Sequence, residues 1–141
     1  MSIKQKIYIT VDALVLFKQK HQQFLLLIKR KNNPFKNQWA LPGGFVDNDE
    51  LVVNACQREL KEETGLDLNV NNFHFLDYFD QPDRDPRSRT VTFAFIVYIE
   101  HKIEVEGNDD AVEACWFDLN DLPELAFDHS KIIKATLNTI S

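Results

Sequence analysis

Apolar residues fall into runs that predict a series of strands. Residues 7–17 and 24–30 are rich in β-branched and aromatic side chains, and they flank a polar segment at 18–23, which is typical of a hairpin. Pro42-Gly43-Gly44 forces a sharp backbone path inside the third apolar segment. Further strands are expected at 73–79, 90–99 and 114–117, with a loop at 31–38.

Two segments have helical character. Residues 50–64 form the first predicted helix, with Gly65 in the position favoured just after a helix end. Asp47 and Glu50, three residues apart, resemble a capping box. The second predicted helix covers 128–138, with Asp128 as its N-cap. This order of elements predicts a mixed α/β sandwich with helices on a sheet, in one domain over 1–141, and not a parallel doubly wound fold.

Composition restricts the classes of partner. The net charge of −6 argues against binding along a nucleic-acid backbone, but a small phosphorylated ligand is compatible with it because a metal can neutralise phosphate locally. The sequence shows neither a signal peptide nor an apolar run of the roughly 20 residues that span a bilayer, so no membrane contact is expected. The two cysteines are too few for a disulfide framework. We therefore expect a cytoplasmic protein, and the sequence is compatible with a homodimer.

Three carboxylates share one face of the first predicted helix. With about 100° between successive residues and Glu59 as the origin, Glu62 lies at about 300° and Glu63 at about 40°, on the side that carries the apolar residues. Like charges at these spacings repel each other, and a buried unpaired carboxylate costs several kcal/mol. A hard divalent cation would compensate them, unless this half of the helix simply projects into solvent.

The spacing around these acids is specific. Gly44 is followed after five residues by Glu50, after seven more by Arg58-Glu59-Leu60, and then by Glu62-Glu63 and Gly65-Leu66. With the flank Trp39-Ala40-Leu41-Pro42-Gly43, this pattern resembles the 23-residue signature of the Nudix hydrolase family at every constrained position. The resemblance implies an α/β/α sandwich with a mixed central sheet.

The resemblance also implies a role for each acid of the cluster. Glu59 and Glu63 would be the principal metal ligands, joined by Glu62 and by the backbone carbonyl of Gly43. Arg58 would orient the glutamates through salt bridges, so Arg58 and Glu62 are the catalytic candidates. The implied cofactor is Mg²⁺, with Mn²⁺ as the alternative.

The neighbouring residues are interpreted less directly. Gly43 and Gly44 lack Cβ atoms, so the backbone here can approach a metal or a phosphate closely, and Gly44 is a candidate for substrate binding. Glu50 lies on the opposite helix face and is interpreted as stabilising the helix start. The acidic segment 104–113 reads mostly as solvated surface, but Asp110 or Glu113 would supply an extra base or metal ligand.

The implied reaction is hydrolysis of the pyrophosphate bond of a nucleoside diphosphate derivative. Metal ions would bridge the carboxylates and the diphosphate and lower the pKa of a water that attacks phosphorus, while a carboxylate accepts the proton. Arg84 and Arg87, in a polar loop at 81–89, would grip phosphate, unless they only pair with the aspartates near them in the loop. Arg84-Asp85-Pro86-Arg87 resembles Nudix members that act on ADP-ribose. We therefore expect a small nucleotide partner, ADP-ribose, cleaved to AMP and ribose 5-phosphate.

Two other readings stay open. One is a Nudix enzyme that sanitises oxidised nucleoside triphosphates. The other is a non-catalytic module that senses ADP-ribose, as in bacterial regulators of this branch, which carry an extra DNA-binding winged helix. The chain ends at Ser141, which leaves no room for such a helix, and the complete set of Arg58, Glu59, Glu62 and Glu63 favours an enzyme. In the segments 107–111 and 127–129, which resemble the same branch, Phe127 and His129 are given no chemical role of their own.

Overall fold

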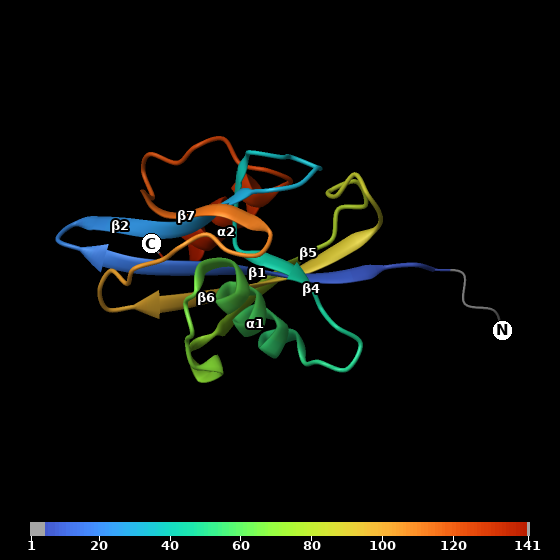
Figure 1. Ribbon diagram of the computed structural model, residues 1–141, viewed down its shortest axis with the longest axis horizontal. Coiled ribbons are helices and arrows are strands. Elements are labelled where there is room, and N and C mark those ends of the chain that lie inside the picture. The colour runs from blue at the N-terminus through green and yellow to red at the C-terminus, as the bar shows by residue number, and fades with distance from the viewer. Residues whose placement is uncertain (1–4, 141) are drawn as a thin grey trace.

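The computed structural model describes residues 5–140 and shows a seven-stranded sheet with helices packed against it (Figure 1). The strands are β1 (Tyr8–Gln19), β2 (Gln22–Arg30), β3 (Trp39–Ala40), β4 (Gly43–Phe45), β5 (His74–Phe79), β6 (Thr90–Ile99) and β7 (Ala111–Asp118). The helices are α1 (Val52–Thr64), the short 3₁₀ helix η1 (Val70–Asn72) and α2 (His129–Ile140).

The sheet is mixed, as the sequence predicted. Its strands follow the order β3-β2-β1-β6-β5, while β4 pairs with β1 and β7 pairs with β2. The long β1 and β6 run parallel, from the pair Tyr8 and Thr90 to the pair Phe17 and Ile99. The other pairings are antiparallel, and β1 and β2 form the expected hairpin. This arrangement places the ends of β1, β2 and β4 next to one another.

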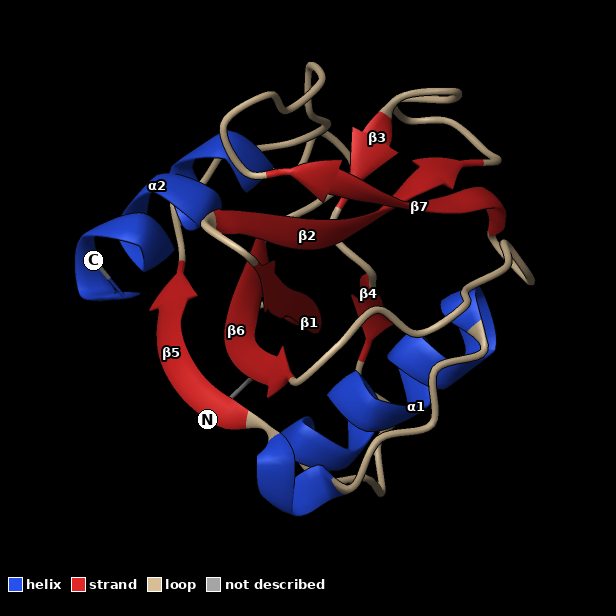
Figure 2. Ribbon diagram, turned by 90° about the vertical axis from the view of Figure 1, so that its left-hand side faces the viewer, coloured by secondary structure: helices blue, strands red, loops and turns tan. Residues whose placement is uncertain are grey.

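The sheet is buried on both faces, which explains the continuous apolar run in β1. Val11, Ala13 and Val15 belong to a core cluster that includes Ala55, Cys56 and Leu60 of α1. Leu14 and Leu16 belong to a second cluster with Ile132 and Ile133 of α2. Successive side chains of a strand point to opposite faces, so one apolar strand serves two cores. Figure 2 shows α1 and α2 on opposite sides of the sheet, which confirms the predicted α/β/α sandwich.

The segment 39–46, where the sequence indicated a sharp backbone path, forms two short strands, β3 and β4, on either side of Leu41 and Pro42. The predicted element ends need two corrections. Strand β7 begins at Ala111, earlier than predicted, because the chain before Ala114 still pairs with β2. The capping box is wrong: α1 begins at Val52 with Leu51 as its N-cap and no side-chain cap. Its end is confirmed, since Gly65 adopts a left-handed φ of 78° and donates to Lys61.

Two smaller expectations concern the membrane and the cysteines. Within residues 5–140, the structure contains no helix of the length and apolarity needed to cross a bilayer. Cys56 and Cys115 are both free, and burial raises the pKa of the Cys56 thiol well above its usual value. The two cysteines are therefore small, unpaired side chains, in agreement with the expected lack of a disulfide framework.

Candidate diphosphate and metal site

A pocket of about 310 Å³ lies where the ends of several elements meet. Strand β1 contributes Asp12, β4 contributes Gly43 and Gly44, and α1 contributes Glu59 and Glu63. The loop between β5 and β6 and the segment that leads into α2 also contribute lining residues. The pocket therefore joins the acidic helix to the arginine-containing loop, which are separate in the sequence.

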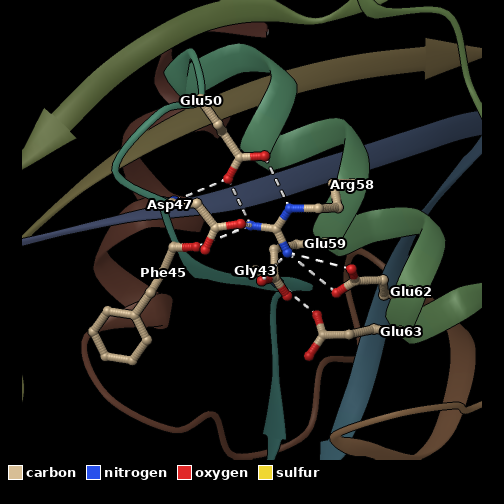
Figure 3. Close-up of polar contacts among 8 residues, drawn as sticks. All are labelled: Gly43, Phe45, Asp47, Glu50, Arg58, Glu59, Glu62 and Glu63. Carbon is tan, nitrogen blue, oxygen red and sulfur yellow. Dashed lines mark hydrogen bonds and ion pairs between the residues drawn. The ribbon is translucent and has the colours of Figure 1, made fainter.

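Arg58 is the centre of the acidic side of the site (Figure 3). Its Nε and Nη2 donate to the two carboxylate oxygens of Glu50 at 2.9 and 2.7 Å. Its Nη1 donates to Glu59 at 2.9 Å and to Glu62 at 3.2 Å, and Nη2 also donates to the carbonyl of Phe45 at 3.1 Å. A planar guanidinium with five donors can serve several carboxylates at once. Arg58 therefore contacts three glutamates, Glu50, Glu59 and Glu62, and its role in orienting them for catalysis stays a prediction.

Glu50 has a different role from the one that the sequence suggested. It does not cap α1, because the helix begins two residues later. Its carboxylate accepts two hydrogen bonds from Arg58 and one from the N–H of Asp47 at 3.0 Å. The hydrogen bonding between Arg58 and Glu50 is the main cause of both of their shifts. It lowers the pKa of Glu50 and raises the pKa of Arg58. Glu50 thus fixes the arginine that in turn holds Glu59 and Glu62.

Glu59 lies against Gly44. The Glu59 side chain is only 13% exposed, and a Cβ atom on Gly44 would come within 2.5–2.6 Å of its carboxylate. Position 44 needs glycine, because the Glu59 carboxylate of α1 lies against its backbone and leaves no room for a Cβ atom. Burial raises the pKa of Glu59 to about 7, and the hydrogen bond from Arg58 opposes this increase only in part.

Glu63 is more deeply buried than Glu59 and contacts the neighbouring glycine. Its Oε1 accepts the backbone N–H of Gly43 at 2.8 Å. Burial raises the pKa of Glu63 well above its usual value, and the charges of Glu59 and Asp110 add to this effect. The sequence analysis assigned the carbonyl of Gly43 to a metal, whereas the contact that the structure shows from Gly43 to the acid cluster uses the N–H. A Cβ atom at this glycine would collide with the carbonyl oxygen of Val11.

The three acids do not face inward equally. Glu59 and Glu63 line the pocket, but the Glu62 side chain is 41% exposed and is held by Arg58 at the edge. Within residues 5–140, no three His, Cys, Asp or Glu side chains converge into a ready metal site. The two pocket acids nevertheless fit a hard divalent cation, because two desolvated carboxylates with raised pKa values offer only oxygen donors and repel each other without a cation between them.

The two loop arginines have acidic partners already. Arg84 is buried, with 3% of its side chain exposed, and its Nε and Nη2 donate to both carboxylate oxygens of Asp128 at 2.9 and 2.7 Å. Arg87 makes the same two-bond contact with Asp85, at 3.0 and 2.8 Å, but 40% of its side chain remains exposed. Asp128 stands directly before α2, at the predicted N-cap position, and its carboxylate binds Arg84. Both arginines line the pocket, and Arg87 is the more accessible.

Arg30 and Phe127 both line the pocket. Arg30 was not predicted there, and Phe127 was noted only as part of a segment that resembles the ADP-ribose branch. The guanidinium carbon of Arg30 lies 4.9 Å from the centre of the Phe127 ring, and that of Arg87 lies 5.6 Å from the same ring. Arg87 also lies over Phe45, at 5.2 Å. Burial lowers the pKa of Arg30, and the charge of Arg87 contributes to this shift. Arg30 and Arg87 therefore form a basic wall of the pocket beside Phe127. Neither the loop pattern nor helical periodicity indicated that the two arginines would meet.

Asp12 and His129 form a second missed feature, a buried polar pair. Nε2 of His129 lies 3.3 Å from Oδ1 of Asp12, and Oδ2 of Asp12 accepts from Thr92 at 2.6 Å. Nδ1 of His129 accepts the backbone N–H of Leu41 at 3.0 Å, so the ring is neutral with its proton on Nε2. Burial lowers the pKa of His129 and raises that of Asp12. An isolated Asp in a strand and a His at a helix start carried no signal of this contact.

The structure separates the two remaining candidates. Asp110 lines the pocket together with Glu59 and Glu63, which form its acidic wall, and the charge of Asp110 acts on Glu63. Glu113 lies outside the lining residues and pairs with Lys29 at 3.5 Å. The pocket thus combines an acidic wall that suits a divalent cation with a basic wall that suits phosphate.

Comparison with known proteins agrees with this description. The model of the NUDIX domain matches residues 8–136. An ADP-ribose pyrophosphatase of Methanocaldococcus jannaschii is 54% identical over 110 residues, which are 78% of this chain and 63% of that protein. A MutT/nudix family protein of Enterococcus faecalis has a crystal structure with a TM-score of 0.91 and 35% identity, over 99% of this chain and 64% of the other.

A third relative has been crystallised with a ligand. The NUDIX domain of Shewanella oneidensis NrtR, in complex with ADP ribose, gives a TM-score of 0.87 at 28% identity, over 97% of this chain and 90% of that chain. The chain belongs to the Nudix family, because the family model covers most of its length. Members of this family generally use divalent metal ions. The chain spans less than two thirds of the length of the M. jannaschii and E. faecalis proteins.

Proposed function

We propose that this chain hydrolyses ADP-ribose to AMP and ribose 5-phosphate with Mg²⁺, and that Mn²⁺ can replace Mg²⁺. The observation that carries the proposal is that Glu59, Glu63, Arg30 and Arg87 all line one pocket. A diphosphate needs both walls, because a cation neutralises one side of it and guanidinium groups bind the other. The 54% identity to an ADP-ribose pyrophosphatase supports ADP-ribose among diphosphates.

The acidic wall would hold the cation. Glu59 and Glu63 would bind it together with the carbonyl of Gly43, and Glu62 would join from the edge of the pocket. When bound, a divalent cation neutralises charge on the diphosphate and makes an attacking water more acidic. Arg58 keeps Glu59 and Glu62 in place, and the Gly43 N–H keeps Glu63 in place.

The remaining pocket residues would bind the substrate and accept the proton. Arg87 would contact a phosphate of the substrate, because its side chain is 40% exposed and lies near the rings of Phe45 and Phe127. Gly44 would let that phosphate approach the backbone. Arg84 would act through Asp128, because its side chain is almost fully buried and two of its donors bind that carboxylate. Asp110 is the stronger candidate for the extra base or ligand, because it lines the pocket and Glu113 does not.

A second candidate function is the binding of ADP-ribose without cleavage. The observation that favours it is the NrtR domain crystallised with ADP ribose, whose fold this chain shares. The two functions differ in one result, the release of product. A sensor would bind ADP-ribose and leave it intact, whereas the proposed enzyme would convert it.

The test is a substrate panel with products identified by mass spectrometry. The purified chain is incubated with Mg²⁺ and with ADP-ribose, a dinucleotide, a nucleotide sugar or an oxidised nucleoside triphosphate. The proposal expects AMP and ribose 5-phosphate from ADP-ribose, faster than product from any other compound. Faster cleavage of the triphosphate would favour the sanitising enzyme, and tight binding of ADP-ribose without any product would favour the sensor.

A further inference from the structure

The N–H of Leu41 is bound by a side chain at a point where strand pairing stops. Strand β3 ends at Ala40, and the segment before α2 runs beside it, with the N–H of Ala126 donating to the carbonyl of Trp39 at 2.8 Å. Leu41 follows β3 directly and is only 2% exposed. Its backbone N–H donates to Nδ1 of His129. The imidazole thus takes the place of a backbone carbonyl and satisfies a buried donor.

Each of the three residues after β3 makes one backbone hydrogen bond that fixes its position. His129 accepts the N–H of Leu41, the carbonyl of Pro42 accepts the N–H of Ala13 at 2.8 Å, and the N–H of Gly43 donates to Glu63 at 2.8 Å. Each contact fixes the peptide that precedes the next one. A shift at Leu41 would therefore move the N–H that orients the most buried carboxylate of the acidic wall.

Asp12 fixes the other side of the same backbone. It faces Nε2 of His129, it is bound by the buried Thr92, and its Oδ1 would lie only 2.8 Å from a Cβ atom at Gly43. Asp12 and Gly43 are also direct partners in the pairing of β1 with β4. The pair of Asp12 and His129 consequently contacts the Leu41–Gly43 segment at both of its ends.

We propose that Asp12 and His129 are positioning residues, which hold the Leu41–Gly43 backbone so that Glu63 is placed for cation binding and for hydrolysis. The inference rests on the function proposed above. It assigns a chemical consequence to two residues that the Nudix signature pattern of Gly44 to Leu66 does not contain. Outer residues that orient metal ligands contribute about ten- to hundred-fold to metal affinity or activity.

Two substitutions separate the two contacts of His129. His129→Asn keeps a side-chain oxygen close to the position of Nδ1, where it can accept from Leu41. His129→Gln places its amide near the position of Nε2 and leaves the N–H of Leu41 without its acceptor. Thr136→Val is the matched control, because it removes another buried side-chain hydrogen bond from α2, the one to the carbonyl of Ile132 at 2.8 Å.

The readouts are steady-state kinetics on ADP-ribose and the affinity for Mn²⁺ alone, measured by calorimetry without substrate. We expect His129→Gln to lose about tenfold or more in kcat and in Mn²⁺ affinity, with KM within about threefold, and His129→Asn to recover most of both losses. Thr136→Val should lower the thermal midpoint and leave kcat and Mn²⁺ affinity unchanged. If both His129 variants behave like Thr136→Val, the pair is a structural contact only and the inference is wrong.

The test remains decisive if a variant or the proposed function fails. Should His129→Gln not fold, Thr92→Val, which frees one oxygen of Asp12, is expected to weaken Mn²⁺ binding about threefold or more. Unchanged Mn²⁺ affinity in that variant would overturn the inference. If wild-type protein does not cleave ADP-ribose, the proposed substrate is wrong, but the order of Mn²⁺ affinities still decides whether the pair positions Glu63.

Discussion

Arg58 binds Glu50 through two parallel hydrogen bonds of 2.9 and 2.7 Å. Neither residue lines the pocket, but Arg58 also holds Glu59, which does. The pairing orients the guanidinium before any cation binds. It also leaves Nη1 free to reach Glu59 and Glu62. The geometry of the acidic helix therefore depends on a residue that precedes that helix.

Replacing Glu50 by Gln should weaken this support and change the response to acid. Charge-assisted bonds of this kind contribute about 1.5–3 kcal/mol each, and the exposure of the pair reduces the expected loss in unfolding free energy to about 1 kcal/mol at pH 7. The pKa of Glu50 is lowered in the folded state, so its stabilisation is present above the usual pKa and is lost as the pH falls through the lowered value.

Urea unfolding at pH 7 and at pH 3 measures this effect. The wild-type protein should lose more stability between these two pH values than Glu50→Gln does. Glu100→Gln, at an exposed position, is the matched control and should behave as wild type. An equal loss in wild type and Glu50→Gln would show that the Arg58–Glu50 contact does not contribute to stability.

Gly44→Ala should impair catalysis more than folding. The added Cβ atom would lie 2.5–2.6 Å from the Glu59 carboxylate, which is the end of a flexible side chain and can move away. We therefore expect the thermal midpoint to stay within a few degrees of wild type. The displacement of Glu59 should lower kcat by about tenfold or more, the usual scale for a misplaced metal ligand. Wild-type kcat in Gly44→Ala would mean that the position of Glu59 is not important for the reaction.

Arg84→Ala should lower the stability of the fold, whereas Arg87→Ala should weaken substrate binding. Arg84→Ala leaves Asp128 with an uncompensated and mostly buried charge, so it should destabilise the fold by about 3–5 kcal/mol. Arg87→Ala should keep the fold and raise KM for ADP-ribose by about ten- to hundred-fold with little change in kcat. Arg87→Lys should recover this only in part, because an ammonium lacks the planar fork.

Unfolding curves and steady-state kinetics of the three arginine variants provide the comparison. If Arg87→Ala keeps KM within about twofold, well under the tenfold that about 1.4 kcal/mol represents, the basic wall does not bind the substrate. The preference for ADP-ribose over other diphosphates would then lose its main physical support.

A divalent cation should stabilise the folded chain. It would bind the assembled acids and not the unfolded chain, and a ligand at a hundred times its dissociation constant contributes about 2.7 kcal/mol. The thermal midpoint should therefore rise with millimolar Mg²⁺ or Mn²⁺ and fall again with a chelator. Glu59→Gln should respond less. An identical response of wild type and Glu59→Gln would place the cation outside the acidic wall.

The sequence predicted the fold because the decisive patterns are local. The apolar run of β1 requires cover on both faces, and Gly65 ends α1 as its position indicated. The acids Glu59 and Glu63 were predicted to face inward from helical periodicity, and they do. Their assigned roles stay predictions until the variants are measured.

Other parts of the site could not be predicted, because they depend on contacts between distant segments. Arg84 was compared only with the aspartates of its own loop, and its partner is Asp128. Asp12 and His129 were each unremarkable in their local context and meet only when β1 lies beside the start of α2. Glu50 was placed on the wet face of a helix that in fact begins at Val52, so its contact with Arg58 was missed.

The most direct test of the account is the release of AMP from ADP-ribose by wild type and by Glu63→Gln over a range of Mg²⁺ concentrations. Glutamine keeps an oxygen that can accept the N–H of Gly43, so the fold should remain intact while the charge for the cation is lost. The account predicts AMP and ribose 5-phosphate from wild type, no product with chelator, and a fall in kcat of at least about a hundredfold in Glu63→Gln. Equal Mg²⁺-dependent turnover by both proteins would contradict it.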